Sequence, residues 1–384
     1  MTPKQFCRLR LFVLIFGFAL FSSGMAHAKQ ICGAPSGETN GWETASPADV
    51  GLDLDALCRL AQRFANWKDA NVHAILVARH GKLVFEQYYT GPDQKWGRPS
   101  DNVVFGPAVP HDLRSITKSV VALLLGIGIE KGWVHDVDQP VLSLLPSYAD
   151  LRTPEKDRIT LRDLLTMSAG FAWNEDLPYS DPANSESRMD NAADPCRFVL
   201  EQPVTYPAGS VWTYSGGSAA LVACILHTAT GKTIDALIEQ NLFEPLGISN
   251  AEWARYPQAG EPVAASGLRL LPRDTLKIGQ LVLNKGNWHG NQLVPAAWVD
   301  EATTPQINGP GAIFYGFQFW LERSLVDHRE VDWAAGVGYG GQRLFIIPSL
   351  DLVVLVHAGL YTSPKQDWVG NVVLNQFVLP AAKP

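Results

Sequence analysis

"LRSITKSVVALLLG" (residues 113–126) begins with polar side chains and continues as an apolar run that fits an inner helix. Ser115 and Lys118 lie three positions apart, so on a helix their side chains share one face and can touch. A serine hydroxyl becomes a strong nucleophile when a neighbouring group takes its proton, and burial lowers the pKa of a lysine towards values at which it accepts one. We therefore expect Ser115 to be a nucleophile at a helix tip and Lys118 to be its base, kept neutral by burial. The alternative is a helix cap followed by a long lysine that reaches solvent.

Two later segments carry chemistry that suits a serine nucleophile. "YPAGSVWTYSGG" (206–217) is a Pro/Gly turn, a short aromatic strand and then Tyr214, whose phenol can pass a proton to a leaving group if it lies near a lysine. "GVGYGGQRLFII" (336–347) places glycines before a strand, where they let the backbone approach a ligand and leave N–H groups for an oxyanion. The alternatives are a core aromatic residue and an ordinary turn.

Strand patterns occur near both ends of the chain. Residues 73–89 are two β-rich runs that meet at His80-Gly81, and residues 342–359 are two more that meet at Pro348–Asp351. Each pair predicts a β-hairpin, and the many β-branched residues indicate the core of a sheet.

Helical patterns lie mainly between these hairpins, separated by a loop-rich stretch over 171–211. Strands near the ends with helices inserted between them predict an α/β body plus a helical part. We expect one domain over 29–384, with the body formed by 29–112 and 265–384 and the helical part by 113–264. The expected helices cover residues 53–67, 159–170, 218–231 and 233–247.

In this order, the three motifs resemble those of the serine β-lactamase and penicillin-recognising superfamily. "LRDLLTMSAG", "LFEPLGI" and "GYGGQRLFIIPSLDLVVL" extend the resemblance over roughly Val72 to the C-terminus, in particular to class C β-lactamase-like esterases and 6-aminohexanoate-dimer hydrolases. The resemblance implies a β-lactamase/transpeptidase-like α/β (α+β) fold. Its antiparallel sheet would combine N- and C-terminal strands, with flanking helices and an inserted, mostly helical subdomain.

The same resemblance implies a role for each motif residue. Ser115 would be the acylated nucleophile, Lys118 its base partner, and Tyr214 the group that protonates the leaving group. The Tyr-Gly-Gly stretch that begins at Tyr339 would stand where Lys-Thr-Gly or His-x-Gly stands in the family. The N–H groups of Ser115 and Gln342 would then form the oxyanion hole.

Two departures from the family pattern bear on the substrate. Gly216 replaces the Asn of Tyr-x-Asn, and Tyr339 replaces the cation that commonly holds a β-lactam carboxylate. Both weaken the alternatives of a β-lactamase or a D-Ala-D-Ala peptidase. We therefore predict an acyl-enzyme hydrolase of a small ester or linear amide. The residues expected around the substrate are Tyr339, Gly341, Gln342, Gly216, Trp173, Tyr179 and Trp212.

The loop 174–194 suggests what the substrate carries. It contains six acidic residues against the single Arg188, so a loop bordering the cleft would favour a protonated amine, as in linear amides of amino acids. The alternative is a solvated acidic loop. The acidic residues are Glu175, Asp176, Asp181, Glu186, Asp190 and Asp194.

Two other functional readings stay open. Gly-Gly-Ser218-Ala-Ala resembles the nucleophile elbow of α/β-hydrolases, with Asp332 and His357 following in that fold's order. A non-catalytic ligand-binding protein on the β-lactamase-like fold is the other. The sequence predicts no cofactor and no metal, because it has no C-x-x-C or H-E-x-x-H motif and its nine histidines are scattered.

The N-terminus predicts export to the periplasm or the medium. Residues 1–28 have the layout of a secretory signal peptide, with a basic start, an apolar stretch over 11–21 and a small-x-small cleavage site that ends at Ala28. Their removal would take the net charge from −7 to −10, which argues against a nucleic-acid partner. We expect a small-molecule substrate and no stable membrane insertion, and the oligomeric state stays open. Three full disulfide pairings are open to the remaining cysteines, which are Cys32, Cys58, Cys196 and Cys224.

Overall fold

The computed structural model describes residues 32–35 and 39–382 of the 384-residue chain. The expected signal peptide over 1–28 lies outside the described residues. Within them, no single helix is long and apolar enough to cross a bilayer, although the bent pair Gly216–Thr230 and Ile234–Leu246 meets the length and composition criteria together.

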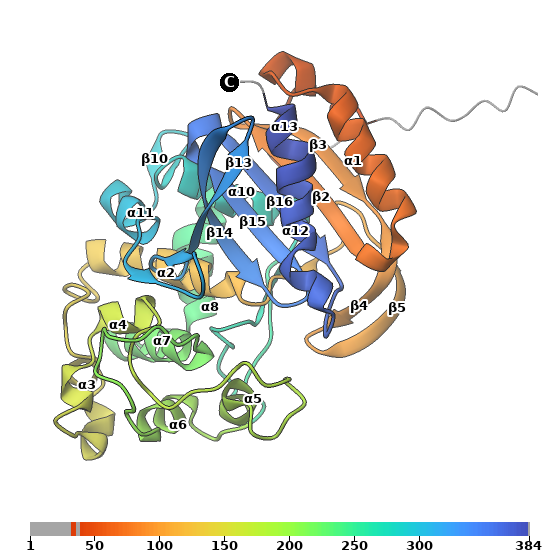
Figure 1. Cartoon of the computed structure of the whole chain (residues 1–384). Helices are drawn as coiled ribbons and strands as arrows, with labels where there is room; N and C mark the ends of the chain where they lie inside the picture. Colours follow the sequence, from red (N-terminus) through yellow and green to blue (C-terminus); the bar gives the residue numbers. More distant parts are fainter. Residues whose placement is uncertain (1–31, 36–38, 383–384) are drawn as a thin grey trace, which may run out of the picture. The chain divides into compact units, whose positions relative to one another are not determined.

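A nine-stranded sheet runs through the described chain (Figure 1). Neighbouring strands are antiparallel, except that β1 runs parallel to β3. Strands from the two ends of the chain therefore form one sheet, as expected. Across the sheet the order is β1 (Glu43–Thr44), β3 (Lys82–Tyr88), β2 (Val72–Arg79), β16 (Leu352–Ala358), β15 (Gln342–Ile347), β14 (Arg329–Gly338), β13 (Trp320–Val326), β12 (Phe314–Tyr315) and β11 (Ile307–Asn308).

Both predicted hairpins are confirmed. β2 and β3 turn at His80-Gly81, where both residues have a positive φ, and β15 and β16 turn through Pro348–Leu350. β16 also pairs with β2, with Leu355 opposite Leu76, so the two hairpins lie side by side in the sheet.

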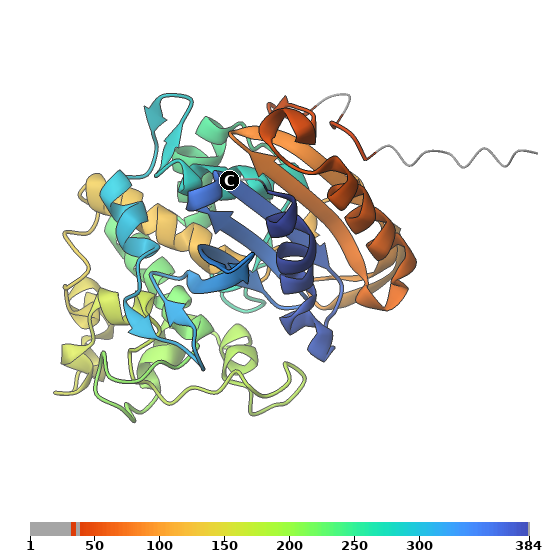
Figure 2. The ribbon, with the colours of Figure 1, turned by 45° about the horizontal axis from the view of Figure 1, so that its top comes forward.

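Each face of the sheet has its own core, because side chains alternate along a strand. On β2, Leu76 packs into one core and Val77 into the other. In both views, α1 (Leu54–Asn66) lies on one face together with the C-terminal helices (Figures 1 and 2). The helices α2 (Ile116–Glu130) and α10 (Pro272–Leu283) pack on the other. The C-terminal helices are α12 (Val369–Val373) and α13 (Leu379–Ala381).

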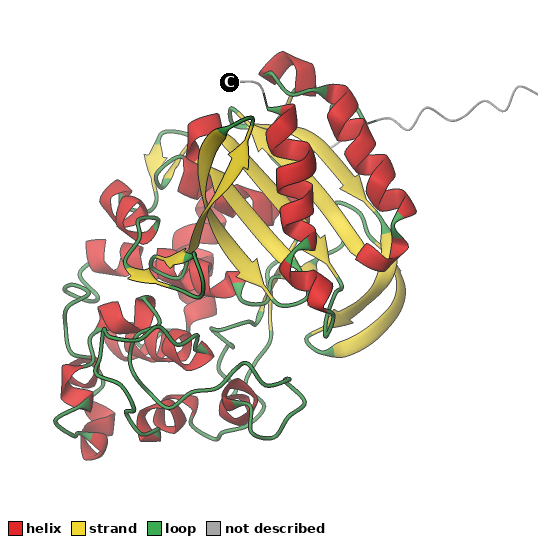
Figure 3. Cartoon of the chain, viewed as in Figure 1, coloured by secondary structure: helices red, strands yellow, loops and turns green. Residues whose placement is uncertain are grey.

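Helices and loops between the hairpins form the helical part, which occupies the lower left of Figure 3. The helices expected within 159–170, 218–231 and 233–247 are present, and the capping box between Thr160 and Asp163 is formed. The stretch 233–247 includes a π-helical turn, Glu239–Phe243. The helices of this region, together with α11 further on, are α3 (Val141–Leu144), α4 (Leu161–Leu165), α5 (Ser185–Asp190), α6 (Pro195–Glu201), α7 (Gly216–Thr230), α8 (Ile234–Ile238), α9 (Glu244–Leu246) and α11 (Ala296–Ala302).

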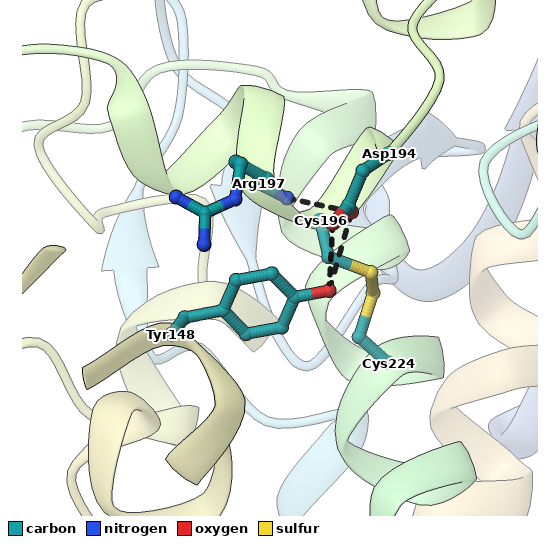
Figure 4. Close-up of a disulfide and its surroundings, with 5 residues drawn as sticks. All are labelled: Tyr148, Asp194, Cys196, Arg197 and Cys224. Atoms are coloured by element: carbon teal, nitrogen blue, oxygen red, sulfur yellow. Dashed lines mark hydrogen bonds between the residues drawn. A yellow bond between two sulfur atoms is a disulfide. The ribbon is translucent and has the colours of Figure 1, made fainter. Parts of the chain in front are cut away.

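The four cysteines of the described chain form two disulfides, Cys32–Cys58 and Cys196–Cys224. Figure 4 shows the second, which links α6 to α7. Beside it, Tyr148 donates a hydrogen bond to Asp194, the N-cap residue of α6. The structure thus selects one of the three pairings that the sequence left open.

Several elements were not expected from the sequence. α5 and α6 lie inside the stretch expected to be loop. α10 lacks a clear apolar stripe in the sequence, because some of its buried positions are the charged residues Arg273, Asp274 and Lys277. The ribbon of β4 and β5 is polar and contains proline, so it lacks the apolar alternation of a strand. The remaining strands are β4 (Thr90–Lys95), β5 (Arg98–Val104), β6 (His111–Asp112), β7 (Glu252–Trp253), β8 (Leu268–Leu270), β9 (Asn287–Trp288) and β10 (Asn291–Gln292).

Candidate active site

Ser115 is the N-cap residue of α2, and the preceding strand fixes its approach. β6 pairs with β8, and Leu113 N donates to Leu268 O at 2.9 Å just before the helix begins. Arg114 has a φ of +50°, a left-handed conformation that costs a residue with a side chain about 1–3 kcal/mol. Such strain is often found beside functional groups, because the surrounding fold must hold it.

Lys118 lies one turn further along α2, on the same face as the serine. Its Nζ donates hydrogen bonds to Ser115 Oγ and to Ala265 O, each at 3.0 Å. The lysine side chain is almost fully buried, with 1% of its surface exposed. The structure thus brings together the two side chains that the spacing in the sequence places on one face.

Tyr214 reaches the same point from the segment before α7. Its phenol lies beside both Ser115 and Lys118, and Lys118 Nζ lies 4.9 Å from the centre of its ring. Burial raises the pKa of Tyr214, although Lys118 acts in the opposite direction. Trp212 and Trp320 pack against this ring at 6.0 and 5.7 Å, so Trp212 supports the tyrosine from behind.

Two glutamates of the acidic loop lie beside this triad. Glu175 accepts hydrogen bonds from Gly216 N and from Trp173 Nε1. Glu186, with 1% of its surface exposed, accepts a hydrogen bond from Ser266 Oγ at 3.1 Å, and the Tyr179 hydroxyl lies 3.5 Å from its Oε2. The two carboxyl groups are close enough to affect each other's ionisation.

The charges of the acidic groups follow from their surroundings. Burial and the neighbouring Glu186 raise the pKa of Glu175 well above its usual value. Burial alone would raise the pKa of Glu186, but Lys118 and its hydrogen bonds lower it. Burial, with Glu186 nearby, raises the pKa of Asp190 to about 8. Within the pair, the negative charge is therefore favoured on Glu186 rather than on Glu175. Asp190 is largely protonated at neutral pH.

The pKa of Lys118 corrects the expectation of an amine kept neutral by burial. Burial does act to lower it, but the acidic side chains around it, of which Glu186 carries the favoured negative charge, outweigh burial and raise the pKa above its ordinary value. The resting lysine is therefore an ammonium group that donates to Ser115 Oγ. It must lose a proton before it can accept the proton of the serine.

A contact with Glu186 explains why position 216 is a glycine. A Cβ at this position would lie 2.8 Å from Glu186 Cδ and 3.0 Å from Glu186 Oε2, so a side chain here would require the Glu186 carboxyl group to move. The Glu186 carboxyl group thus occupies the space into which the Asn of a Tyr-x-Asn motif would extend. The change that removes an amide from the motif makes room for a carboxylate.

A cleft opens at Ser115 between the loop 174–194 and the turn between β14 and β15. Tyr179 and Tyr339 line it, with their rings 5.0 Å apart, and Glu186 and Asp190 lie on its acidic side. Trp173 and Trp212 do not line this cleft, and neither do Gly341 and Gln342. Its lining residues are Gln94, Trp96, Gly97, Arg114, Ser115, Pro178, Tyr179, Ser180, Glu186, Ser187, Asp190, Ser266, Tyr339 and Thr362.

The structure favours a different second oxyanion donor from the one that the resemblance implied. Gln342 is fully buried as the first residue of β15, paired with Gly338, and its side chain bonds to Ala358 O. Tyr339 lines the cleft instead, and neither its backbone N–H nor that of Ser115 donates to any acceptor in the part of the chain that the structure describes. These two N–H groups are the better candidates for an oxyanion hole.

Comparison with known proteins identifies the family to which the chain belongs. The family model described as Beta-lactamase matches residues 61–370, which is most of the sequence. The chain belongs to the β-lactamase family. Its fold is the β-lactamase/transpeptidase-like α/β fold, with a large mixed sheet flanked by helices.

Relatives within the β-lactamase family have different activities. The 6-aminohexanoate-dimer hydrolase of Paenarthrobacter ureafaciens is 24% identical over 363 residues, covering 88% of this chain and 85% of the relative. Esterase EstB of Burkholderia gladioli is 27% identical over 212 residues, covering 52% of this chain and 51% of the esterase, about half of each. A penicillin-binding protein homologue from Caulobacter crescentus superposes with a TM-score of 0.63 at 18% identity, covering 81% of this chain and 94% of the homologue.

The α/β-hydrolase alternative does not fit this β-lactamase-family structure. Ser218 is buried in the first turn of α7, Asp332 lies in β14 with its side chain 86% exposed, and His357 is fully buried in β16. His357 Nδ1 bonds to Gln342 rather than to an acid or a serine. No contact among the described residues joins the three.

The sequence reasoning missed two groups of the site. Arg114 brings a cation to the cleft, held 3.1 Å from Asp112 and packed 5.2 Å from the Tyr361 ring centre. Its position directly before Ser115 was the available signal. Ala265 O, which accepts a hydrogen bond from Lys118, is a backbone group. Every residue has such an oxygen, so the sequence does not indicate which one contacts the lysine.

Proposed function

We propose that this chain hydrolyses a small ester or linear amide through an acyl-enzyme on Ser115. The observation that carries the proposal is the 3.0 Å hydrogen bond between Lys118 Nζ and Ser115 Oγ, with the phenol of Tyr214 in contact with both. A base and an acid within reach of one hydroxyl are what acyl transfer requires. The family relatives named as esterases and amide hydrolases support the same reaction class.

The reaction follows from these groups. Once the Lys118–Tyr214 pair has lost a proton, it accepts the proton of Ser115 while Oγ attacks the carbonyl carbon. The N–H groups of Ser115 and Tyr339 face the oxygen on which negative charge develops. Tyr214 then donates the proton to the departing alcohol or amine as the C–O or C–N bond breaks. Water adds to the acyl-enzyme in the same way and releases the acid.

Labelling with a fluorophosphonate tests the nucleophile. We expect the wild-type chain to be labelled at Ser115, because the probe phosphorylates an activated serine. Ser115→Ala should abolish labelling, whereas Ser218→Ala should retain it. A wild-type chain that stays unlabelled while its circular dichroism shows a folded protein would instead support the non-catalytic binding reading.

We also propose that the substrate carries a protonated amine. Glu186 is ionised at the cleft and Asp190 lies beside it. Solvent reaches these carboxyl groups poorly, so a bound ammonium group would form charge-assisted hydrogen bonds that water does not provide there. The cation would also offset the negative charge of Glu186, which holds the pKa of Lys118 high. Binding an ammonium group should therefore favour the deprotonated, reactive form of the lysine.

A pair of substrates tests this preference. The p-nitroanilide of 6-aminohexanoic acid should react with a kcat/KM at least about tenfold above that of its N-acetyl derivative, a difference of about 1.4 kcal/mol. The preference should grow from pH 7 to 9, because Asp190 ionises near pH 8 while the substrate amine stays charged. Glu186→Gln should bring the ratio close to one, and Asp176→Asn, a change at an exposed acid of the same loop, should not. Equal rates for both substrates in the wild-type protein would refute the amine preference but leave Ser115 labelling unaffected.

A further inference from the structure

Two histidines and an aspartate that are far apart in the sequence meet inside the fold. They are His73 on β2, Asp93 on β4 and His111 on β6, with 0%, 8% and 1% of their surfaces exposed. His73 Nδ1 lies 2.8 Å from His111 Nε2, and Asp93 Oδ1 lies 3.8 Å from the first nitrogen and 3.7 Å from the second. Three potential ligand atoms therefore converge on one point.

In each ring, one nitrogen faces the other histidine (the inner nitrogen) and one faces away from it (the outer nitrogen). The partner of each outer nitrogen shows whether the inner nitrogen carries a proton. His73 Nε2 faces Pro92 O at 3.1 Å, and His111 Nδ1 faces Asp112 O at 3.0 Å. A carbonyl oxygen only accepts, so each of these outer nitrogens must be the N–H donor. In the neutral form, both inner nitrogens are then lone pairs, which face each other at 2.8 Å without a proton between them.

A positive charge is needed where these lone pairs meet. A metal ion between the two nitrogens would supply it. Histidine ligands in metal sites are neutral and donate their other N–H to a carbonyl or a carboxylate, which fixes the ring orientation. Both imidazoles already have this arrangement.

We propose that His73 Nδ1, His111 Nε2 and Asp93 Oδ1 bind a divalent transition-metal ion of the zinc class. Zinc bonds of about 2.0–2.1 Å in tetrahedral geometry separate the ligand atoms by about 3.3 Å. The observed distances of 2.8, 3.7 and 3.8 Å lie on both sides of this value, so a small separation of the two rings would accommodate the ion. Two imidazoles with one carboxylate are a ligand set that zinc uses.

The surroundings supply the supports that such a site needs. Tyr361 donates a hydrogen bond to Asp93 Oδ1 at 3.2 Å and so orients the carboxylate. Phe105 stacks on the His73 ring with 4.0 Å between the ring centres and shields it from solvent. The outer partners of the histidines are backbone carbonyls, which hold both rings in place.

The ion would support the active site from outside the cleft. β6, which carries His111, leads into Ser115 four residues later, and Asp112 on the same strand binds Arg114 and Trp96 N. β4, which carries Asp93, leads into Gln94 and Trp96 on the cleft wall. The proposed ion thus joins three strands next to the nucleophile, and we assign it a structural role.

Metal titration of the tag-free wild-type chain tests the proposal. After dialysis against a chelator, calorimetric titration with Zn²⁺ should show about one site per chain, and Zn²⁺ should raise the thermal midpoint by at least about 3 °C. Co²⁺ in place of Zn²⁺ should give the visible absorption of a tetrahedral nitrogen–oxygen site. A folded wild-type chain that shows neither heat, nor a shift in the midpoint, nor cobalt bands would overturn the proposal.

Two variants locate the ion. Asp93→Asn keeps the size of the side chain but removes the anionic ligand, and it should weaken Zn²⁺ binding by at least about tenfold. His80→Asn is the matched control, because His80 is half exposed and lies at the β2–β3 turn. It should leave the affinity for Zn²⁺ unchanged. Equal affinity in Asp93→Asn, or a comparable loss in His80→Asn, would show that the ion binds elsewhere.

Discussion

Replacing Lys118 with methionine is expected to lower kcat/KM for p-nitrophenyl esters by about 1,000-fold or more, because the hydroxyl of Ser115 loses the group that accepts its proton. The amine donates to Ser115 Oγ and to Ala265 O, both at 3.0 Å, and no other basic side chain contacts that hydroxyl among the described residues. Methionine has a similar length and is apolar, so it fills the buried space without adding a charge. Glu186 loses a cation that lowers its pKa, so the variant favours the protonated form of this carboxyl group. Stopped assays with purified variants measure the loss directly.

The pH profile separates a chemical role of Lys118 from a structural one. Surrounding acidic groups raise the pKa of this lysine, so its reactive form becomes more populated as the pH rises. In the wild-type chain, kcat/KM for a neutral ester should therefore increase through the alkaline range, and this increase should be absent from Lys118→Met. Lys277→Met is the control, because Lys277 is also buried but pairs with Asp274 on α10. If Lys118→Met kept the wild-type profile at reduced amplitude, the lysine would not be the titrating base.

Asp112→Ala should lower the free energy of unfolding by about 3–5 kcal/mol, because it leaves a buried cation without its partner. Asp112 is fully buried, and Arg269 Nη1 donates to its Oδ1 at 2.6 Å. Arg114 Nη2 lies 3.1 Å from Oδ2, to which Trp96 N also donates at 2.7 Å. Urea unfolding at equilibrium measures the change.

The matched control for this carboxylate is Asp101→Ala. Asp101 lies exposed on β5, so its loss should change the free energy of unfolding by no more than about 0.5 kcal/mol. A loss of less than about 1 kcal/mol in Asp112→Ala would show that water enters and solvates the two arginines. Because Asp112 also holds Arg114 beside the nucleophile, the variant should lose activity even where it remains folded.

Local patterns in the sequence were sufficient for the two hairpins in the nine-stranded sheet and for the meeting of Ser115 with Lys118. Both hairpins consist of β-branched runs around short turns, and a serine and a lysine three residues apart on a helix share a face whatever the rest of the fold does. The β4–β5 ribbon and α10 were not predicted, because their polar residues obscure the spacing of apolar residues from which strands and helices are predicted.

The electrostatics of the site could not be predicted in this way. The sign of the shift in the pKa of Lys118 depends on Glu175 and Glu186, which lie far along the chain and were recognised only as members of an acidic loop. The convergence of His73 and His111, which are 38 positions apart, likewise depends on how β2 and β6 are arranged. Pairing between distant segments is a property of the tertiary structure, and a single sequence carries no local pattern for it.

The bond between Cys196 and Cys224 encloses the segment that carries Tyr214 and Gly216 in a covalent ring with a sequence separation of 28. In a chain-entropy description, a ring of this size lowers the conformational entropy of the unfolded chain and so stabilises the folded chain by about 3.5 kcal/mol. With both sulfurs reduced, the phenol would keep its neighbours in the sequence but lose this tether to α6. With Tyr214 as the proposed proton donor, the thiol–disulfide balance of the surroundings would act on the reaction through atoms that never touch the substrate.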